Sequence, residues 1–176
     1  MGQEACFVQQ LYAKVIDQED YQGIKILNSN NEFVGDIFKA TVSGCDDKNT
    51  YGFKHANGLE VILGLQLRRF KDLNVAKYTV ECQGEHFTLK EKKLRNFMNF
   101  QVDGVINDQS YVFKDDKEVT LIMYKNNDLI ATMNDRNIYV EEVSDLETGL
   151  LVLMYFMYKL YKREDYHLAR LLHRSW

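Results

Sequence analysis

Two clusters of basic residues are the side chains in this sequence best suited to bind an anionic ligand. The first contains Arg68, Arg69 and Lys71, and the second contains Lys92, Lys93 and Arg95. Arg presents a rigid fork of N–H donors that matches phosphate, and Lys offers a compact charge. The alternative is that both clusters are solvated surface, because charged runs usually lie on exposed faces. These six residues are the candidate anion-binding or lipid-binding site.

The charge of the whole chain is −4, but its distribution is uneven. Residues 66–96 carry eight Lys and Arg against four Asp and Glu, whereas residues 97–149 carry four against eleven. The last segment, 150–176, is again basic. A net acidic chain is not expected to bind nucleic acid non-specifically. The basic segments could form one patch only if the fold brings them together.

Signs of catalysis or metal binding are weak. Cys82 and His86 are separated by a turn and could face one another as a thiolate–imidazole pair, but a buried Cys beside a surface His is the more common arrangement. The four histidines lack the spacing of metal ligands, and the pairs Asp46-Asp47 and Asp115-Asp116 indicate turns. No nucleotide-binding glycine loop or nucleophile elbow occurs. We therefore expect no catalytic residue, metal or cofactor; the alternative is a small enzyme or carrier with a site in a barrel mouth.

The cysteines and the first residues bear on the compartment. Cys6, Cys45 and Cys82 are odd in number and scattered, which favours free thiols in a cytosolic protein. The first fifteen residues lack the basic and apolar regions of a secretory signal. Gly2 is not followed by the Ser or Thr at position six that myristoylation requires. We expect a cytoplasmic protein, peripheral to a membrane if it binds lipid.

Hairpin signals recur between residues 20 and 143. Turn clusters rich in Asn, Asp and Gly separate short runs of β-branched and aromatic residues, which is typical of antiparallel strands. The turns expected in this way are 28–31, 55–58, 83–85, 114–117 and 126–128. Alternation in Val80-Glu81-Cys82 and in residues 100–103 indicates strands with one apolar face. Short helices are considered at 73–77 and 90–95.

The pattern changes after residue 143. Ser144 and Glu147 have the spacing of a capping box, which predicts the start of a helix over residues 145–162. Residues 149–158, GLLVLMYFMY, have no charge or amide side chain, so this helix must be buried on all sides. Ten residues rise only about 15 Å, too little to cross a bilayer of about 30 Å. The tail 163–176 is amphipathic, and either closes the barrel mouth with Trp176 or contacts a membrane or a partner.

This layout, hairpins followed by a wholly apolar helix, resembles the tubby C-terminal-like superfamily, which includes tubby-like proteins, phospholipid scramblases and relatives of the LURP-one type. The resemblance covers roughly residues 12–162 and is best in the units 28–38 and 57–67 and in the helix, with a size like that of the bacterial members. It implies a twelve-stranded antiparallel barrel threaded by the helix. Tubby proteins bind phosphoinositide head groups through basic surface residues, but no matching motif is present here. The palmitoylated Cys-rich segment and calcium site of the scramblases are not recognisable either.

The sequence therefore predicts one domain over residues 1–176, since 176 residues with 45% hydrophobic content suit a single core. Its strands are expected over about 5–143, its central helix over about 145–162 and its tail over 163–176. The expected fold is a mainly β antiparallel barrel that encloses the helix. The expected function is non-enzymatic binding of an anionic phospholipid head group or of a protein partner, without a transmembrane span.

Overall fold

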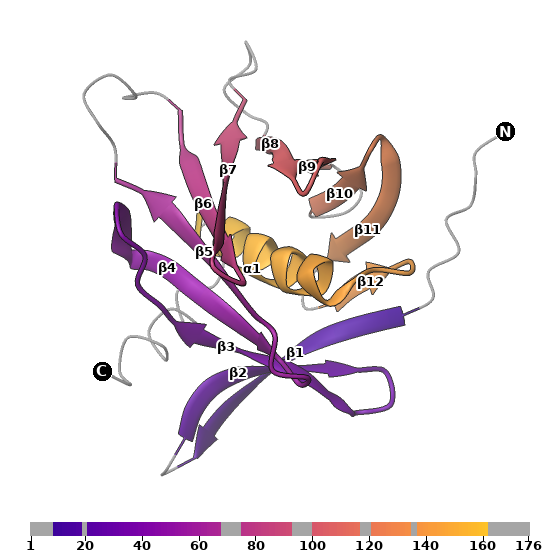
Figure 1. The fold of residues 1–176 in the computed structure, drawn as a ribbon. Coiled ribbons are helices and arrows are strands. Elements are labelled where there is room, and N and C mark those ends of the chain that lie inside the picture. The colour runs from indigo at the N-terminus through magenta and orange to yellow at the C-terminus, as the bar shows by residue number, and fades with distance from the viewer. Residues whose placement is uncertain are drawn as a thin grey trace, which may run out of the picture.

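The computed structural model describes residues 9–18, 21–67, 75–92, 100–116, 121–134 and 137–161. These ranges form twelve strands and one helix, labelled in Figure 1. The strands are β1 (Gln9–Gln18), β2 (Tyr21–Asn28), β3 (Phe33–Lys39), β4 (Cys45–His55), β5 (Glu60–Gln66), β6 (Lys77–Cys82), β7 (Glu85–Glu91), β8 (Gln101–Ile106), β9 (Gln109–Asp115), β10 (Leu121–Lys125), β11 (Asp128–Asn134) and β12 (Asn137–Val140). The helix is α1 (Asp145–Tyr161).

The strands form a closed antiparallel barrel. Each strand pairs with the strands before and after it in the chain, and β1 pairs with β12 to close the sheet. The predicted fold, an antiparallel barrel of about twelve strands with a C-terminal helix, is confirmed. Because the strands alternate in direction, successive turns lie at alternate ends of the barrel. We call the end where α1 begins the N-cap end and the end where α1 finishes the exit end.

The tight turns at the N-cap end follow from residues that tolerate positive φ. Gln83–Gly84, Asn107–Asp108 and Asn126–Asn127 each place two consecutive residues at positive φ. Such turns have the twist that joins antiparallel strands with only two residues between them. The turns expected near residues 83–85 and 126–128 are confirmed. The turn at 107–108 was not predicted, although Asn-Asp between two β-prone runs is a suitable signal.

The strand walls have an apolar inner face. In β6, Tyr78, Val80 and Cys82 are buried, whereas the residues between them are half-buried. This is the period of two that a strand with one face on a core requires. The alternation predicted from Val80-Glu81-Cys82 is therefore confirmed, and Cys82 points to the core side.

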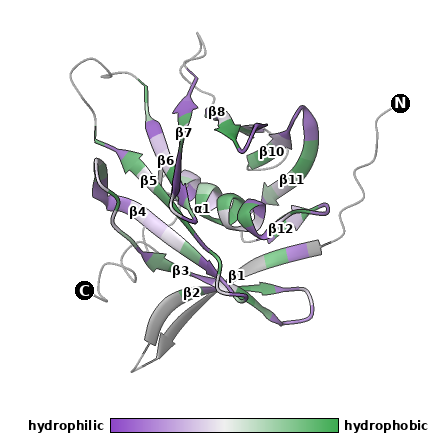
Figure 2. Ribbon diagram, in the orientation of Figure 1, coloured by the Kyte–Doolittle hydropathy of each residue, from purple (hydrophilic) through white to green (hydrophobic). Residues whose placement is uncertain are grey.

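The helix α1 lies among the strands and supplies the centre of the core (Figure 1). Every residue from Leu150 to Tyr158 is buried, with at most 7% of its surface exposed. Figure 2 shows mainly hydrophobic colouring along α1. Gly149 allows the close approach, because a Cβ at this position would lie 2.7 Å from a methyl group of Val61 on β5. The predicted central helix is confirmed.

The first turn of α1 has the predicted capping box. The Ser144 hydroxyl accepts a hydrogen bond from the Glu147 N–H at 3.2 Å, and the Glu147 carboxylate accepts one from the Ser144 N–H at 2.8 Å. These reciprocal bonds satisfy backbone donors that the start of a helix leaves unpaired. They fix the point at which the chain leaves β12 and enters the barrel.

The short helices considered at 73–77 and 90–95 are wrong where the structure describes these residues. Lys77 begins β6, and Lys90 and Glu91 end β7. Lys77 and Lys90 are cross-strand partners, so backbone pairing between two strands overrides the local helical preference. Residues 163–176, including Trp176, lie outside the described residues, as do 68–74 and 93–99.

Candidate functional site

Lys92 is the member of the predicted basic site that the structure describes. Its Nζ lies 2.5 Å from the Asp103 carboxylate, and its N–H donates to the Gln101 carbonyl at 2.8 Å. The ion pair neutralises part of the charge that Lys92 would offer a ligand. The other predicted members, Arg68, Arg69, Lys71, Lys93 and Arg95, lie outside the described residues.

The described residues that flank the two basic segments are hydrogen-bonded neighbours. The Ala76 N–H donates to the Glu91 carboxylate at 3.0 Å, and the Glu91 N–H donates to the Ala76 carbonyl at 2.8 Å. Next to them, Lys77 and Lys90 stand in direct register across β6 and β7. The chain therefore enters and leaves both basic segments at the exit end of the barrel, and two further lysines are concentrated there.

The last turns of α1 reach the same end. The ring of Tyr158 makes an edge contact with Phe100, the residue before β8, with 5.0 Å between ring centroids. Lys159 follows, with its Nζ 5.5 Å from the Tyr155 ring. A cation in the last turn of a helix is favoured by the helix dipole. The exit end thus combines the helix C-terminus with the flanks of both predicted basic segments.

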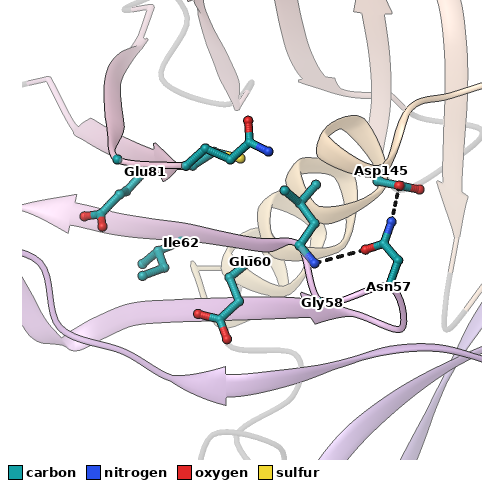
Figure 3. Close-up of a pocket in the computed structure, with 10 residues that line it drawn as sticks. Asn57, Gly58, Glu60, Ile62, Glu81 and Asp145 are labelled. Carbon is teal, nitrogen blue, oxygen red and sulfur yellow. Dashed lines mark hydrogen bonds between the residues drawn. The ribbon is translucent and has the colours of Figure 1, made fainter.

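A pocket of about 710 Å³ lies at the opposite, N-cap end (Figure 3). It lies between the β4–β5 and β6–β7 hairpins and the start of α1, and its lining includes the carboxylates of Glu60, Glu81 and Asp145. Each carboxylate has a partner within the protein: Glu60 lies 3.2 Å from Lys54 Nζ, and Glu81 lies 3.7 Å from His86 Nδ1. The third, Asp145, holds α1 to the β4–β5 turn.

Asp145 accepts a hydrogen bond from the Asn57 side-chain amide, which Figure 3 shows as a dashed line. Its other carboxylate oxygen lies 3.3 Å from His55 Nε2. The Asn57 backbone N–H donates to His55 Nδ1 at 3.3 Å, so the remaining ring N–H faces Asp145. Asn57 also accepts a 3.0 Å hydrogen bond from the Leu59 N–H. This network fixes the helix start to one side of the barrel. Among the described residues that line the pocket, no buried side-chain nitrogen or oxygen lacks a hydrogen-bond partner.

A buried charged cluster holds the helix start to the other side. The carboxylate of Glu147, only 3% exposed, lies 2.6 Å from Lys125 Nζ and accepts a hydrogen bond from the Tyr111 hydroxyl at 2.8 Å. Burial alone would raise the pKa of Glu147, but the bonds from Lys125, Ser144 and Tyr111 outweigh burial and lower it. Burial, with the hydrogen bond to Glu147, raises the pKa of Tyr111. The cluster anchors the helix rather than exposing a reactive group.

Among the lysines that the structure describes, Lys39 on β3 has a clearly shifted pKa. Its Nζ is buried, lies 4.0 Å from the centroid of the Tyr51 ring and has no hydrogen-bond partner among the described residues. Burial lowers the pKa of Lys39 to about 8, although Asp46 and Asp47 oppose the shift. Burial also raises the pKa of Tyr51 to about 12. Because the Nζ is covered, Lys39 is not presented to a ligand.

The pairing of Cys82 with His86, considered as an alternative, does not form. Glu81 is the cross-strand partner of His86, and Cys82 is the partner of Glu85, so Cys82 and His86 lie on opposite faces of the hairpin. Burial, with the nearby charge of Glu85, raises the pKa of the Cys82 thiol. A raised pKa reduces the thiolate, which is the nucleophilic form. The arrangement does not resemble an activated cysteine.

Two further properties concern the described ranges as a whole. Within them, no group of three His, Cys, Asp or Glu side chains is placed to hold a metal ion. In the same part of the chain, no helix has both the length and the apolar character needed to cross a membrane. Cys45 and Cys82 are free thiols.

Sequence reasoning missed most of the anchoring cluster. Glu147 was recognised as part of a capping box, but its partners Tyr111 and Lys125 precede it by 36 and 22 residues and have no motif that connects them. The link between Asn57 and Asp145 spans 88 residues and was missed for the same reason. Only closure of the barrel brings these positions to one end.

Comparisons with family models, with characterised proteins and with solved structures gave no significant match for this chain.

Proposed function

We propose that this chain is a non-enzymatic barrel of the tubby C-terminal-like type that binds the head group of an anionic phospholipid at its exit end. The residues proposed to contact the head group are those predicted from the sequence: Arg68, Arg69, Lys71, Lys92, Lys93 and Arg95. The protein would act in the cytoplasm, at the surface of a membrane. A protein partner with an acidic surface is the alternative ligand for these basic residues.

One observation carries the proposal: the described flanks of the two basic segments are joined by hydrogen bonds between Ala76 and Glu91. Segments that are separated in the sequence therefore begin or end at neighbouring points of the same barrel end. The Lys77–Lys90 pair adds positive charge there. Clusters of basic residues attract anionic membranes with about 1 kcal/mol for each Lys or Arg near the surface.

The resemblance in architecture gives secondary support. A closed twelve-stranded barrel with a buried apolar helix is the fold that the superfamily implies, and this architecture is present here. Fold alone does not establish function, so the proposal depends on the charge at the exit end. The enzyme alternative depended on Cys82 and His86 as a catalytic pair. These two residues lie on opposite faces of their hairpin, so the pair does not support it.

Vesicle co-sedimentation tests the proposal directly. We expect binding to vesicles of phosphatidylcholine with phosphatidylserine, little binding to phosphatidylcholine alone, and weaker binding as salt rises. The double variant Arg68→Ala, Arg69→Ala should lose about 2 kcal/mol, or roughly thirtyfold in affinity.

A matched control removes two charges from the barrel wall instead. Lys25 and Lys54 lie on β2 and β4, both in register with Asp36 of β3, away from the exit end. The variant Lys25→Ala, Lys54→Ala should bind vesicles like the unmodified protein. Absence of binding at low salt would reject the lipid proposal, and equal losses in both double variants would reject the site.

A further inference from the structure

Asn57 and Gly58, in the β4–β5 turn, are the one Asn-Gly pair in the sequence. Asn is chemically labile, because the backbone nitrogen of the following residue can attack the carbon of its side-chain amide. Glycine hinders this attack least, since it has no Cβ beside the nitrogen. Both residues are exposed, so water reaches the atoms that would react. The turn, at the end of the barrel opposite the proposed lipid site, therefore contains the components of spontaneous deamidation.

Hydrogen bonds hold each of the reacting groups in the folded protein. The nucleophile, the Gly58 nitrogen, donates its N–H to the His55 carbonyl at 2.8 Å. The oxygen of the Asn57 amide accepts the Leu59 N–H at 3.0 Å. The leaving group, the amide nitrogen, donates to the Asp145 carboxylate at the start of α1 (Figure 3). Attack requires the Gly58 hydrogen bond to break, and departure of the amide nitrogen requires the Asp145 hydrogen bond to break.

We propose that Asn57 is a covalent modification site, at which water converts the amide to aspartate or isoaspartate, and that docking of α1 through Asp145 controls the rate. The Gly58 nitrogen loses its proton to solvent and forms a bond to Cγ of Asn57. The Cγ–Nδ2 bond breaks and ammonia leaves with a proton from solvent, so a succinimide ring remains. Water then opens either of the two bonds that join the Gly58 nitrogen to the ring carbonyls. The net reaction consumes water and releases ammonia.

The product places a second carboxylate against Asp145. The new oxygen stands where the amide nitrogen donated, so a donor–acceptor pair becomes two like charges in contact. Isoaspartate also lengthens the backbone of the turn by a methylene group, which disturbs the hydrogen bond between Gly58 and His55. Deamidation therefore releases the start of α1 from the β4–β5 turn. The bonds of Glu147 remain, so the helix stays attached to β9 and β10.

Asp103 and Gly104 in β8 provide a comparison within the same chain. Asp before Gly can form the same succinimide, with loss of water in place of ammonia. Here the backbone is fixed in the barrel wall, because Gly104 is paired on both sides and a Cβ there would lie 2.7 Å from the Leu89 side chain and the Thr88 carbonyl. The Asp103 carboxylate is also held by Lys92. We expect no reaction at Asp103, so an exposed turn and not the local sequence alone makes the site.

Incubation of the full chain at neutral pH, followed by peptide mapping with mass spectrometry, measures the rate at Asn57. The reference is a synthetic peptide of residues 53–62, in which the same Asn-Gly pair lacks the fold. We expect the folded protein to react at least about tenfold more slowly than the peptide, and at the peptide rate in urea. Equal rates in the folded protein and the peptide would overturn control by the fold. Absence of deamidation in urea would overturn the site.

Variants test the control by α1. Asp145→Ala removes the acceptor of the leaving amide and should raise the rate about tenfold. Glu142→Ala removes a nearby exposed charge outside the network and should leave the rate unchanged. Ile24→Val lowers the stability of the barrel at a buried position of β2 and should also leave it unchanged. A rate in Asp145→Ala no higher than in either control would show that docking of α1 does not control the reaction.

Two further variants test the nucleophile and the consequence. Gly58→Ala, made in the Asp145→Ala background, adds a Cβ beside the nucleophile in open space and should slow the reaction again. An unchanged rate would exclude attack by the nitrogen of residue 58. Asn57→Asp makes the aspartate product and should lower the free energy of unfolding more in the unmodified protein than in Asp145→Ala, because repulsion needs both carboxylates. Additive losses would show that the product does not act on the start of the helix.

Discussion

The hydroxyl of Tyr111 on β9 donates a 2.8 Å hydrogen bond to Glu147, the third residue of α1. The same carboxylate oxygen lies 2.6 Å from Lys125 Nζ on β10, and the other oxygen accepts the N–H of Ser144. One side chain therefore caps the helix and connects it to two strands of the wall. This geometry fixes both the depth and the rotation of α1 in the barrel, and it makes stability sensitive to the state of Glu147.

The first prediction concerns pH. The folded protein lowers the pKa of Glu147 below its ordinary value of 4.5, so between these two pKa values the unfolded state binds more protons. The free energy of unfolding contributed by Glu147 is therefore present above pH 4.5 and lost as pH falls through the lowered pKa. Urea unfolding between pH 3 and 7 measures this effect. As the pH falls, the free energy of unfolding should decrease less in Glu147→Gln than in the unmodified protein. The exposed Glu142→Gln is the control, and an unchanged pH profile in Glu147→Gln would contradict the prediction.

The second prediction concerns Gly149. Replacing Gly with Ala within a helix usually stabilises a protein by about 0.5–1 kcal/mol. Here the added Cβ would lie 2.7 Å from Val61, so Gly149→Ala should instead lower the free energy of unfolding by about 1–3 kcal/mol.

A double-mutant cycle checks the cause of this effect. Val61→Ala removes the methyl groups nearest to the new Cβ, so the loss caused by Gly149→Ala should be smaller in the Val61→Ala background. Additive losses, measured by urea unfolding, would show that contact with Val61 is not the reason.

The third prediction tests the central helix. Leu153 is fully buried in the middle of α1, and an aspartate there would place a charge in the core without a partner. Leu153→Asp should abolish cooperative folding. Leu67→Asp makes the same exchange at a site that is 60% exposed and should melt like the unmodified protein. A soluble Leu153→Asp protein with a cooperative thermal transition would exclude the buried position of α1.

The fourth prediction concerns Cys82. Its burial and raised pKa predict slow alkylation by iodoacetamide near neutral pH, slower than that of an exposed model thiol. Unfolding in urea should raise the rate to that of the model thiol. Peptide mapping by mass spectrometry assigns the rate to Cys82. Rapid alkylation in the folded state would revive the possibility of an activated thiol.

The fifth prediction concerns Lys39. Burial lowers its pKa to about 8 from an ordinary 10.5, so between these values the unfolded state binds more protons and stability rises with pH. Lys39→Met should remove this rise between pH 8 and 9.5 and should stabilise the protein at pH 7, because the buried charge is lost. Lys54→Met, at an exposed site, is the matched control. If the rise in stability with pH persists in Lys39→Met, another group causes the rise and the prediction is wrong.

Local chemistry made much of the fold predictable. The turns near Gly84 and Asn127, the alternation in β6 and the capping box of Ser144 and Glu147 are properties of short stretches of chain. The short helices considered at Lys77 and Lys90 were wrong, because register between β6 and β7 decides the conformation of those residues. The number of strands came from the resemblance rather than from these local signals.

For the candidate sites, less could be predicted from the sequence than for the fold. The basic residues were visible in the sequence, but the hydrogen-bonded approach of Ala76 and Glu91 that brings their segments to one barrel end was not. The short ladder between β7 and β8, with its three register pairs, had no signal in the sequence, because it depends on how two hairpins meet in the barrel.

The sequence by itself determined several of the turns, which strand faces are apolar and that residues 149–158 must be buried, since these follow from side-chain chemistry and local periodicity. Only the tertiary structure decided that Glu147 meets Tyr111 and Lys125, that Cys82 and His86 lie on opposite faces, and that β7 and β8 share a short ladder. Such contacts join residues far apart in the chain, and their geometry depends on strand register and barrel closure, which no short stretch of sequence specifies.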